Sequence, residues 1–300
     1  MSNSGPSPRQ TLSYLRELFA AHGIRPKNKL GQNFLIDLNL LDLIVRTAEL
    51  SRADLVLEVG TGTGGLTARL AREAGAVLSV EIDEDFFSLA NEVLAGQEHV
   101  TILHTDVLEN KNKLCPEVLS TLAELRRRYS SQNLKMVANL PYAVATPVIA
   151  NFLLLDLRFE RMVVMVQAEI AERLLAMPGT KEYGALAVLI QSLADVEAVR
   201  RHVPPVVFWP RPQVASAIML IRPNAAKRAR VGDVGRFRLF LRDLYTHRRK
   251  NLRGALAALP NSRHAKTEID SLLNQLGVSG TARAEDLNAE QHLRLCEVFG

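Results

Sequence analysis

The stretch that decides the fold is residues 55–65, LVLEVGTGTGG, in which a short apolar run leads directly into a cluster of glycines. Such a run is typical of a parallel strand that is buried on both faces. The glycines allow a tight turn at the start of a helix, where backbone N–H groups can face a closely approaching ligand. The stretch therefore predicts a strand, a ligand-binding loop and a helix, in that order.

Comparable apolar runs recur along the chain and indicate further strands. They are AVLSVEID (76–83), VTILHTD (100–106), KMVANLPY (135–142), RMVVMVQ (161–167), LAVLIQSLADV (186–196) and ASAIMLIR (215–222). Stretches with helical spacing lie between most of them, and residues 10–22 and 38–48 also show helical spacing. Alternating strands and helices predict an α/β, doubly wound, mostly parallel sheet, in which ligands bind beyond the carboxyl ends of the strands.

Charge divides the chain into a near-neutral body and a basic tail. The 300 residues carry a formal charge of +5, but residues 222–300 alone hold +7 and residues 1–221 hold −2. The tail shows helical patterns at 236–259, 266–277 and 284–299 and no strand-like run. We therefore expect an N-terminal lead and helix (1–26), an α/β domain (27–222) and a small basic helical domain (223–300). The excess charge points to a polyanionic partner, either nucleic acid or an anionic membrane, with a solvated helical surface as the alternative.

Several other classes of protein are disfavoured. No run approaches the ~18 consecutive apolar residues of a membrane span, and the polar N-terminus does not resemble a signal peptide. Cys115 and Cys296 lie far apart without CxxC spacing, which predicts neither a disulfide framework nor a zinc site. The histidines show no ligand spacing either. We expect a cytoplasmic protein without a bound metal and without membrane attachment.

The glycine loop by itself fits two kinds of cofactor. Gly60, Gly62 and Gly65 satisfy the GxGxxG pattern, and Glu81 follows about 20 residues later, as the ribose-binding acid of a dinucleotide fold does. Glu58, two residues before the first glycine, would repel a pyrophosphate. A cation without phosphates, such as S-adenosylmethionine (SAM), has no such conflict. An NAD-dependent oxidoreductase nevertheless remains an alternative at this point.

The tetrapeptide Asn139-Leu140-Pro141-Tyr142 indicates which chemistry follows. The exocyclic amine of adenine is a poor nucleophile because its lone pair is delocalised into the ring. We expect the Asn139 side-chain oxygen and the Pro141 carbonyl to accept its N–H bonds and turn the lone pair toward a methyl donor. Tyr142 offers a face for stacking, worth on the order of 1 to 3 kcal/mol. Positioning carries this reaction, with no need for a metal or a strong general base.

Four features in this order resemble the class I SAM-dependent methyltransferases that act on adenine N6. They are EVGTGTGG (58–65), Glu81, Asp106 at the end of the third strand and NLPY (139–142). Five more segments are similar to the small-subunit (16S) rRNA adenine N6,N6-dimethyltransferases, the kasugamycin-resistance type. They are LGQNFL (30–35), residues 165–191, FWPRPQVAS (208–216), HRRKNLR (247–253) and ARAEDL (282–287). The resemblance runs from about Lys27 to the C-terminus and implies a seven-stranded Rossmann-like sheet followed by a small helical domain.

The resemblance also implies roles for individual residues. Residues of the N-terminal loop, the glycine loop and the following strand ends would form the SAM site. Glu81 would bind the ribose and Asp106 the cofactor adenine. The full set is Asn33, Leu35, Glu58, Gly60, Gly62, Glu81, Asp106 and Asn139. Asn139 would lie beside both the methyl donor and the target amine, and Phe208 would form a second aromatic wall opposite Tyr142. The catalytic set is thus Asn139, Pro141, Tyr142 and Phe208.

The implied substrate is ribosomal RNA. The family adds two methyl groups to each of two adjacent adenines near the 3′ end of small-subunit rRNA, within an assembling small subunit. We expect a monomer that contacts RNA phosphates through the basic tail, with Arg248, Arg249, Lys250 and Arg253 as contacts. A non-contacting, solvated helix face is the alternative for these four residues.

The chain departs from the family pattern at two places, both of which concern substrate placement. Residues 143–147 read AVATP where the family usually has Asn-Ile-Ser-Thr-Pro, and the 107–138 segment is longer, with a helix-like insert ending in Arg126–Arg128. Two other functions remain open, a 23S-type (macrolide-resistance) adenine methyltransferase and a non-catalytic assembly or transcription factor on the same fold. ARAEDL and FWPRPQVAS favour the small-subunit group, and the intact NLPY favours activity.

Overall fold

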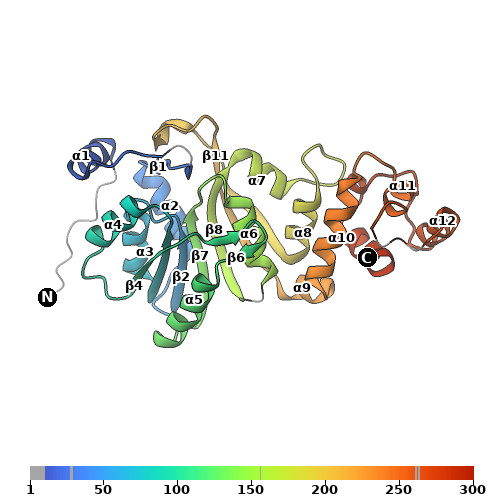
Figure 1. The fold of residues 1–300 in the computed structure, drawn as a ribbon, viewed down its shortest axis with the longest axis horizontal. Coiled ribbons are helices and arrows are strands. Elements are labelled where there is room, and N and C mark those ends of the chain that lie inside the picture. Colours follow the sequence, from blue (N-terminus) through green and yellow to red (C-terminus); the bar gives the residue numbers. More distant parts are fainter. Residues whose placement is uncertain (1–10, 28–29, 156, 261, 263) are drawn as a thin grey trace. The chain divides into compact units, whose positions relative to one another are not determined.

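The computed structural model describes residues 11–27, 30–155, 157–260, 262 and 264–300, and the chain divides into two compact units (Figure 1). The first unit comprises Met1–Ala171 and Glu197–Arg222, and the second comprises Glu172–Val196 and Pro223–Gly300. The polar lead expected at residues 1–10 lies outside the described residues. The α/β domain expected at 27–222 differs from the first unit, because residues 172–196 group with the C-terminal helices.

A seven-stranded sheet forms the centre of the first unit and confirms the doubly wound α/β prediction. In spatial order its strands are β4 (Val100–His104), β3 (Ala76–Glu81), β2 (Asp54–Val59), β7 (Asn133–Asn139), β8 (Phe159–Gln167), β11 (Ser216–Pro223) and β9 (Ala194–Val203). From β4 to β8 all neighbours are parallel, and β11 runs antiparallel to β8. The helices of this unit are α1 (Leu12–His22), α2 (Leu38–Ala48), α3 (Gly65–Glu73), α4 (Glu84–Val93), α5 (Pro116–Arg128) and α6 (Ala145–Leu154).

Burial explains why the apolar runs form the central strands. All six residues of β2 and of β3 are buried, as expected for parallel strands covered by helices on both faces. A short hairpin of β5 (Leu108–Asn110) and β6 (Lys113–Leu114) precedes α5, which ends at Arg128 as the insert predicted. The parallel strands therefore bring their carboxyl ends, and the loops that follow them, to a single edge of the sheet.

The N-terminal segment that contains α1 and β1 packs over that edge of the sheet. Strand β1 (Phe34–Leu35) pairs antiparallel with β10 (Phe208–Trp209), which follows the 3-10 turn Pro205–Val207. Helix α1 is capped by Thr11 and ends at Gly23, as its spacing predicted, and Phe19 of this helix packs edge-on against the Phe34 ring at 5.3 Å. In Figure 1, β1 and the gold segment that contains β10 lie together above the sheet.

The strand predicted at residues 186–196 was wrong. Residues 185–193 form helix α8, and the strand of the sheet, β9, follows it at Ala194–Val203. A continuous apolar run does not distinguish a buried helix from a buried strand by periodicity, and α8 is buried through most of its length. Strand β9 lies at the edge of the sheet and is rich in charged residues, so it carries no apolar run.

The second unit is helical. Besides α8 and the end of α7 (Ala168–Leu175), it contains α9 (Ala225–Val231), α10 (Val234–Thr246), α11 (Leu252–Leu256), α12 (Lys266–Gln275), the turn Ala284–Asp286 and α13 (Ala289–Phe299). The helical pattern expected over 236–259 is interrupted at residues 247–251, because α10 ends at Thr246 and Asn251 caps a new helix. Within the described residues, no helix is both long and apolar enough to cross a membrane.

Candidate functional site

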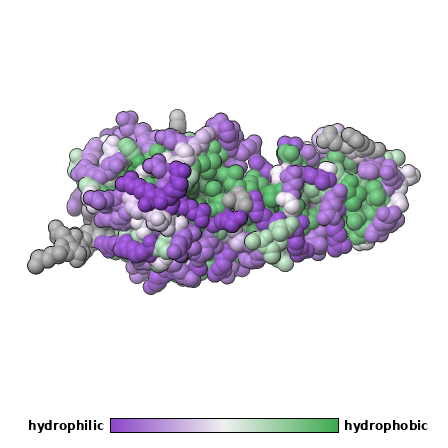
Figure 2. All heavy atoms as spheres, turned by 90° about the horizontal axis from the view of Figure 1, so that it is seen from below, coloured by the Kyte–Doolittle hydropathy of each residue, from purple (hydrophilic) through white to green (hydrophobic). Residues whose placement is uncertain are grey.

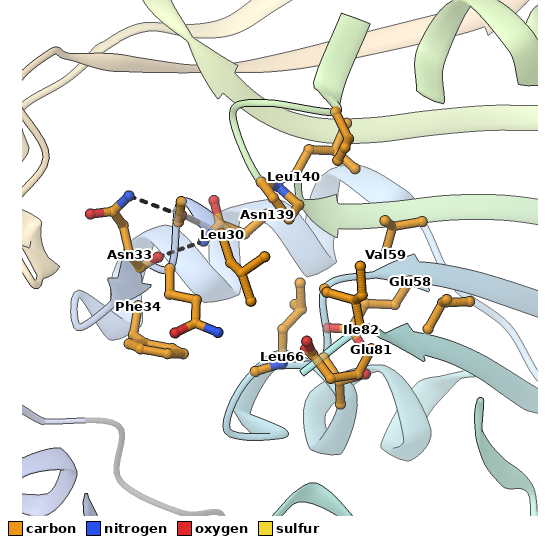
Figure 3. Close-up of a pocket in the computed structure, with 18 of the residues that line it drawn as sticks. Leu30, Asn33, Phe34, Glu58, Val59, Leu66, Glu81, Ile82, Asn139 and Leu140 are labelled. Carbon is orange, nitrogen blue, oxygen red and sulfur yellow. Dashed lines mark hydrogen bonds between the residues drawn. The ribbon is translucent and has the colours of Figure 1, made fainter. Parts of the chain in front are cut away.

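Three loops meet at the carboxyl edge of the sheet and enclose a cavity of about 230 Å³. They are the N-terminal segment 30–35, the glycine loop after β2 and the Asn139–Val144 turn after β7. In Figure 3, Asn33 and Phe34 lie on one side of this cavity and Glu58 and Glu81 on the other, with Asn139 between them. Segments that are far apart in the sequence thus contribute to one site, at the edge where doubly wound sheets bind ligands.

Two glycines allow the three loops to approach each other closely. Gly60 has φ +86°, and a Cβ atom there would lie 3.3 Å from Pro141 Cδ. Gly62 has φ +53°, and its Cβ atom would lie 3.0 Å from Cε1 of Phe34. A positive φ is costly for residues with a side chain, and both contacts are tighter than most Cβ contacts in proteins, so a side chain there would displace Pro141 or Phe34 slightly. The backbone conformation and the close neighbours therefore both favour glycine at these two positions.

Glu58 lies beneath the glycine loop and is only 1% exposed. Its Oε2 accepts hydrogen bonds from Thr67 Oγ1 at 2.6 Å and from Ser79 Oγ at 2.7 Å. Burial raises the pKa of this carboxyl to about 8, and nearby Glu81 adds to the effect. Thr67 and Ser79 were not singled out from the sequence, since hydroxyls buried against a strand carry no pattern of their own.

Glu81 is the second buried carboxylate, at 6% exposure. Its Oε2 accepts the Gly62 N–H at 2.8 Å and its Oε1 accepts the Asp83 N–H at 2.9 Å, so it holds the glycine loop in place. Burial raises the pKa of this carboxyl also. In the described part of the chain neither Glu58 nor Glu81 has a Lys, Arg or His partner within ion-pair distance.

The pair of buried carboxylates tests which cofactor the cavity fits. A ligand with positive charge and no phosphate would stabilise both ionised carboxylates, as SAM would with its sulfonium and ammonium groups. The pyrophosphate of a dinucleotide would add like charge beside them. Asp106 is exposed, lines the same cavity and accepts the Leu108 N–H at 2.9 Å. The donor set therefore fits SAM and disfavours the NAD alternative.

Asn139 is half-buried at the end of β7, and its orientation is determined by one hydrogen bond. Its Nδ2 donates to the backbone carbonyl of Asn33 at 3.1 Å, and Asn33 Nδ2 in turn donates to the Gly31 carbonyl at 3.0 Å. Only the amide nitrogen can donate to a carbonyl, so this bond assigns the two ends of the Asn139 amide. The Oδ1 atom is left as an acceptor for a ligand.

The expectation for the Pro141 carbonyl was wrong. This oxygen accepts the N–H groups of Val144 and Ala145, both at 3.1 Å, in the turn that begins α6. Both of its lone pairs are therefore occupied. Leu140 lines the cavity, and its carbonyl has no hydrogen-bond partner among the described residues, which makes it a candidate acceptor in this turn.

Tyr142 lines the cavity as the sequence predicted, and a residue that the sequence reasoning missed holds it. Its Oη lies 2.7 Å from Oγ of Ser216, the first residue of β11, which is fully buried. Ser216 is also the last residue of the FWPRPQVAS segment. Its position in that segment was the only available signal, because nothing local to Ser216 indicates a partner 74 residues away.

The structure does not bring Phe208 to the cavity. Its side chain is 3% exposed and belongs to the hydrophobic core together with Leu35, its partner in the β1–β10 pair. The cavity is lined by the other expected residues, namely Asn33, Leu35, Glu58, Gly60, Gly62, Glu81, Asp106, Asn139, Pro141 and Tyr142. The aromatic side chain that lines it in addition is Phe34, which sequence reasoning passed over as part of LGQNFL.

The four basic residues expected to contact RNA lie in the second unit, in and after the turn between α10 and α11, and all are exposed. Arg248 pairs with Glu285 at 3.0 Å, and Arg253 pairs with Asp270. Arg249 and Lys250 have no carboxylate partner in the part of the chain that the structure describes. The four residues are thus not equivalent, because two of them already have their charge compensated.

Comparisons with known proteins agree with this geometry. Residues 23–299 match the model of the family described as ribosomal RNA adenine dimethylase. The chain is 40% identical to ribosomal RNA small subunit methyltransferase A of Pelotomaculum thermopropionicum, covering 95% of both chains. Among solved structures it is similar to a dimethyladenosine transferase from Plasmodium falciparum, with a TM-score of 0.69, 23% identity and coverage of 86% of this chain and 94% of the other. The 23S rRNA methyltransferase ErmE gives a TM-score of 0.61 and 27% identity, covering 89% of this chain and 99% of the other.

Proposed function

The chain belongs to the ribosomal RNA adenine dimethylase family, and from this premise we propose that it dimethylates adenine N6 in small-subunit rRNA with SAM as methyl donor. The single observation that carries the mechanism is the hydrogen bond from Asn139 to the Asn33 carbonyl, which leaves Oδ1 of Asn139 as an acceptor at the cavity. The targets that we propose are the two adjacent adenines near the 3′ end of that RNA.

Residues on β2 and β3 and their loops would hold the cofactor. Glu58 and Glu81 supply negative charge in a buried setting, and the carboxylate of Glu81 is the candidate for the ribose hydroxyls. Asp106 would contact the cofactor adenine, and Gly60 admits the methionine part because it has no side chain. When bound, SAM supplies an electrophilic methyl group that needs no further activation.

The Asn139–Tyr142 turn would position the target amine. Oδ1 of Asn139 and the carbonyl of Leu140 are candidate acceptors in this turn, and together they would fix both N–H bonds of the amine. When both N–H bonds are held, the nitrogen lone pair points away from them, toward the methyl donor. The amine and its surroundings then need not rearrange to reach the transition state. Tyr142, held by Ser216, offers the surface on which the base would stack.

A 23S-type specificity is the nearest alternative. ErmE shares the fold at 27% identity, whereas the curated small-subunit relative from P. thermopropionicum reaches 40% over nearly the full length of both chains. This difference supports the small subunit as the target. The Asn139 geometry supports an active enzyme over a non-catalytic assembly factor, since the acceptor at the cavity has no role in a purely scaffolding protein.

A methyl-transfer assay tests the proposal. The protein is incubated with labelled SAM and either small or large ribosomal subunits from a strain that lacks this gene, and the RNA is digested to nucleosides. We expect N6,N6-dimethyladenosine from the small subunit alone. Label in the large subunit alone would favour the 23S alternative, and no label in either would refute the activity. We further propose that the protein acts as a cytoplasmic monomer, with light scattering as the test of its size.

A further inference from the structure

Residues 198–221, which run from the middle of β9 through the connecting segment into β11, carry a local excess of positive charge. They contain Arg200, Arg201, His202 and Arg211 and not a single Asp or Glu. Arg200, Arg201 and Arg211, which we call the arginine rim, are all exposed. These residues belong to the first unit, so their charge was hidden in the near-neutral total of residues 1–221.

The register of the sheet places the rim at the cavity edge. Arg222 at the end of β11 pairs with Glu197 near the start of β9 at 3.2 Å, and the Asn224 N–H just after β11 donates to the Leu193 carbonyl just before β9 at 2.9 Å. The end of β11 thus lies beside the start of β9, so these neighbouring strands run antiparallel. The end of β9, six residues after Glu197, therefore lies beside the start of β11 at Ser216. Because Ser216 holds Tyr142, Arg200 and Arg201 lie at the same edge of the sheet as the proposed target site.

Some arginines of the first unit form ion pairs with carboxylates, whereas the rim arginines do not among the described residues. Arg161 pairs with Glu49 at 2.8 Å and Arg222 pairs with Glu197. Within the described ranges, no carboxylate lies within ion-pair distance of any of the three rim arginines. Their guanidinium groups are thus available to an external anion, and arginine is suited to bind phosphate with two parallel hydrogen bonds.

The size of the cavity shows why such a surface is needed. A space of about 230 Å³ is smaller than the ~300–1,000 Å³ of common small-molecule pockets and cannot hold a nucleic-acid strand. Most of an RNA substrate must then lie outside it. Val207 follows Arg201 by six positions, and its carbonyl accepts the Ile36 N–H at 2.9 Å beside the cavity wall. Arg201 therefore lies at most about 20 Å from that wall along the chain.

We propose that Arg200, Arg201 and Arg211 bind the phosphate backbone of the RNA next to the base that enters the cavity. The inference rests on the proposed function, since it names how the same site holds its substrate. It shifts the expected RNA contact toward the catalytic unit, where the three rim arginines have no carboxylate partner among the described residues, in addition to the tail, where Arg248 and Arg253 are paired.

The test measures the salt dependence of RNA binding. The triple variant Arg200→Gln, Arg201→Gln, Arg211→Gln is compared with the wild type, using unmethylated small-subunit rRNA as the probe. Each phosphate contact contributes ~0.7 to 0.9 to the slope of log K against log salt, so we expect the slope to fall by about 2 to 3. SAM affinity should not change, because none of the three residues lines the cavity.

A matched control makes the same charge change at the opposite edge of the sheet. Arg46, Arg72 and Arg127 are exposed and lie near the ends of α2, α3 and α5, just before the strands begin. Figure 2, which views the molecule from below, shows that hydrophilic residues cover most of the surface of the first unit there. Their triple Gln variant should keep the wild-type slope.

The outcomes separate this inference from the proposed function. If the wild type methylates the RNA and the rim variant keeps both its slope and its affinity, the rim does not bind phosphate and the inference is overturned. If the control variant loses as much slope as the rim variant, the effect is one of net charge and the inference is equally overturned. If the wild type does not methylate small-subunit RNA at all, it is the proposed function that fails.

Discussion

Nδ2 of Asn139 donates a hydrogen bond to the backbone carbonyl of Asn33 across 3.1 Å, joining the turn after β7 to a loop 106 residues earlier in the chain. This bond determines the direction of the Asn139 amide and therefore which atom faces the cavity. The N-terminal loop thus takes part in orienting the catalytic side chain, in addition to covering the cavity.

Replacing Asn139 by Ala should remove methyl transfer while leaving SAM affinity nearly intact. The loss of one positioned acceptor typically lowers kcat by ~10²- to 10³-fold. Single-turnover methylation of small subunits and calorimetric titration with SAM measure the two quantities separately. Retention of wild-type activity by the variant would refute the role of Asn139.

Replacing Glu81 by Ala should weaken SAM binding by about 10- to 100-fold, the cost of losing hydrogen bonds to a charged group. Glu84→Ala is the matched control, since Glu84 is exposed in the first turn of α4 and does not line the cavity. Thermal unfolding shows whether the glycine loop, which Glu81 also holds, stays folded. An unchanged dissociation constant for the Glu81 variant contradicts the ribose assignment.

SAM affinity should rise with pH up to about 8. Because burial raises the pKa of Glu58 to about 8, the cofactor-free protein holds this carboxyl mostly protonated at pH 7. A cation favours the ionised form, so binding should release a proton, and affinity should increase until Glu58 is already ionised. Calorimetry in buffers of different ionisation enthalpy counts this proton. Glu58→Gln should reduce both the release and the slope, leaving only what Glu81 contributes, and an identical pH profile for the variant rules the explanation out.

Ser216→Ala should lower methylation by roughly 5-fold, because the lost Tyr142–Ser216 hydrogen bond is worth about 1 kcal/mol. Ser216→Thr keeps the hydroxyl and should restore most of the rate. Since Ser216 acts through Tyr142, the kcat and KM for RNA should change while SAM affinity stays constant. If the Ala and Thr variants behave alike, the hydroxyl has no positioning role.

The second unit should lose stability in mild acid through His292. This residue is fully buried near Tyr245, and burial lowers its pKa to about 4. Between pH ~4 and ~6.5 the unfolded chain binds a proton that the folded chain rejects, so stability rises with pH over this window, by up to about 3 kcal/mol. Urea unfolding at pH 4.5 and pH 7 measures the difference. His292→Gln should reduce it, and equal pH dependence in both proteins speaks against this assignment.

Local patterns were sufficient for most of the sheet and for the cavity. Buried parallel strands need continuous apolar runs, and the loops after them need glycine or particular polar residues, so LVLEVGTGTGG and NLPY predicted both their conformation and their meeting point. Strand β9 was not predicted because a strand at the edge of a sheet does not need an apolar run. Helix α8 was mistaken for a strand because a helix that is buried on most sides lacks amphipathic spacing.

The sequence by itself determined the fold class, the family resemblance and most of the expected residues at the cavity, all except Phe208. Only the tertiary structure decided how those residues are used. It showed that the Pro141 carbonyl is occupied, that Phe208 belongs to the core, and that Ser216 holds Tyr142. It also showed that two of the four tail cations are paired, while the three rim arginines have no carboxylate partner in the described part of the chain. The reason is physical. Whether a segment forms a strand, a helix or a tight loop depends on residues that are close in the sequence, so local patterns predict it. Hydrogen bonds and ion pairs depend on partners that folding brings together from distant parts of the chain.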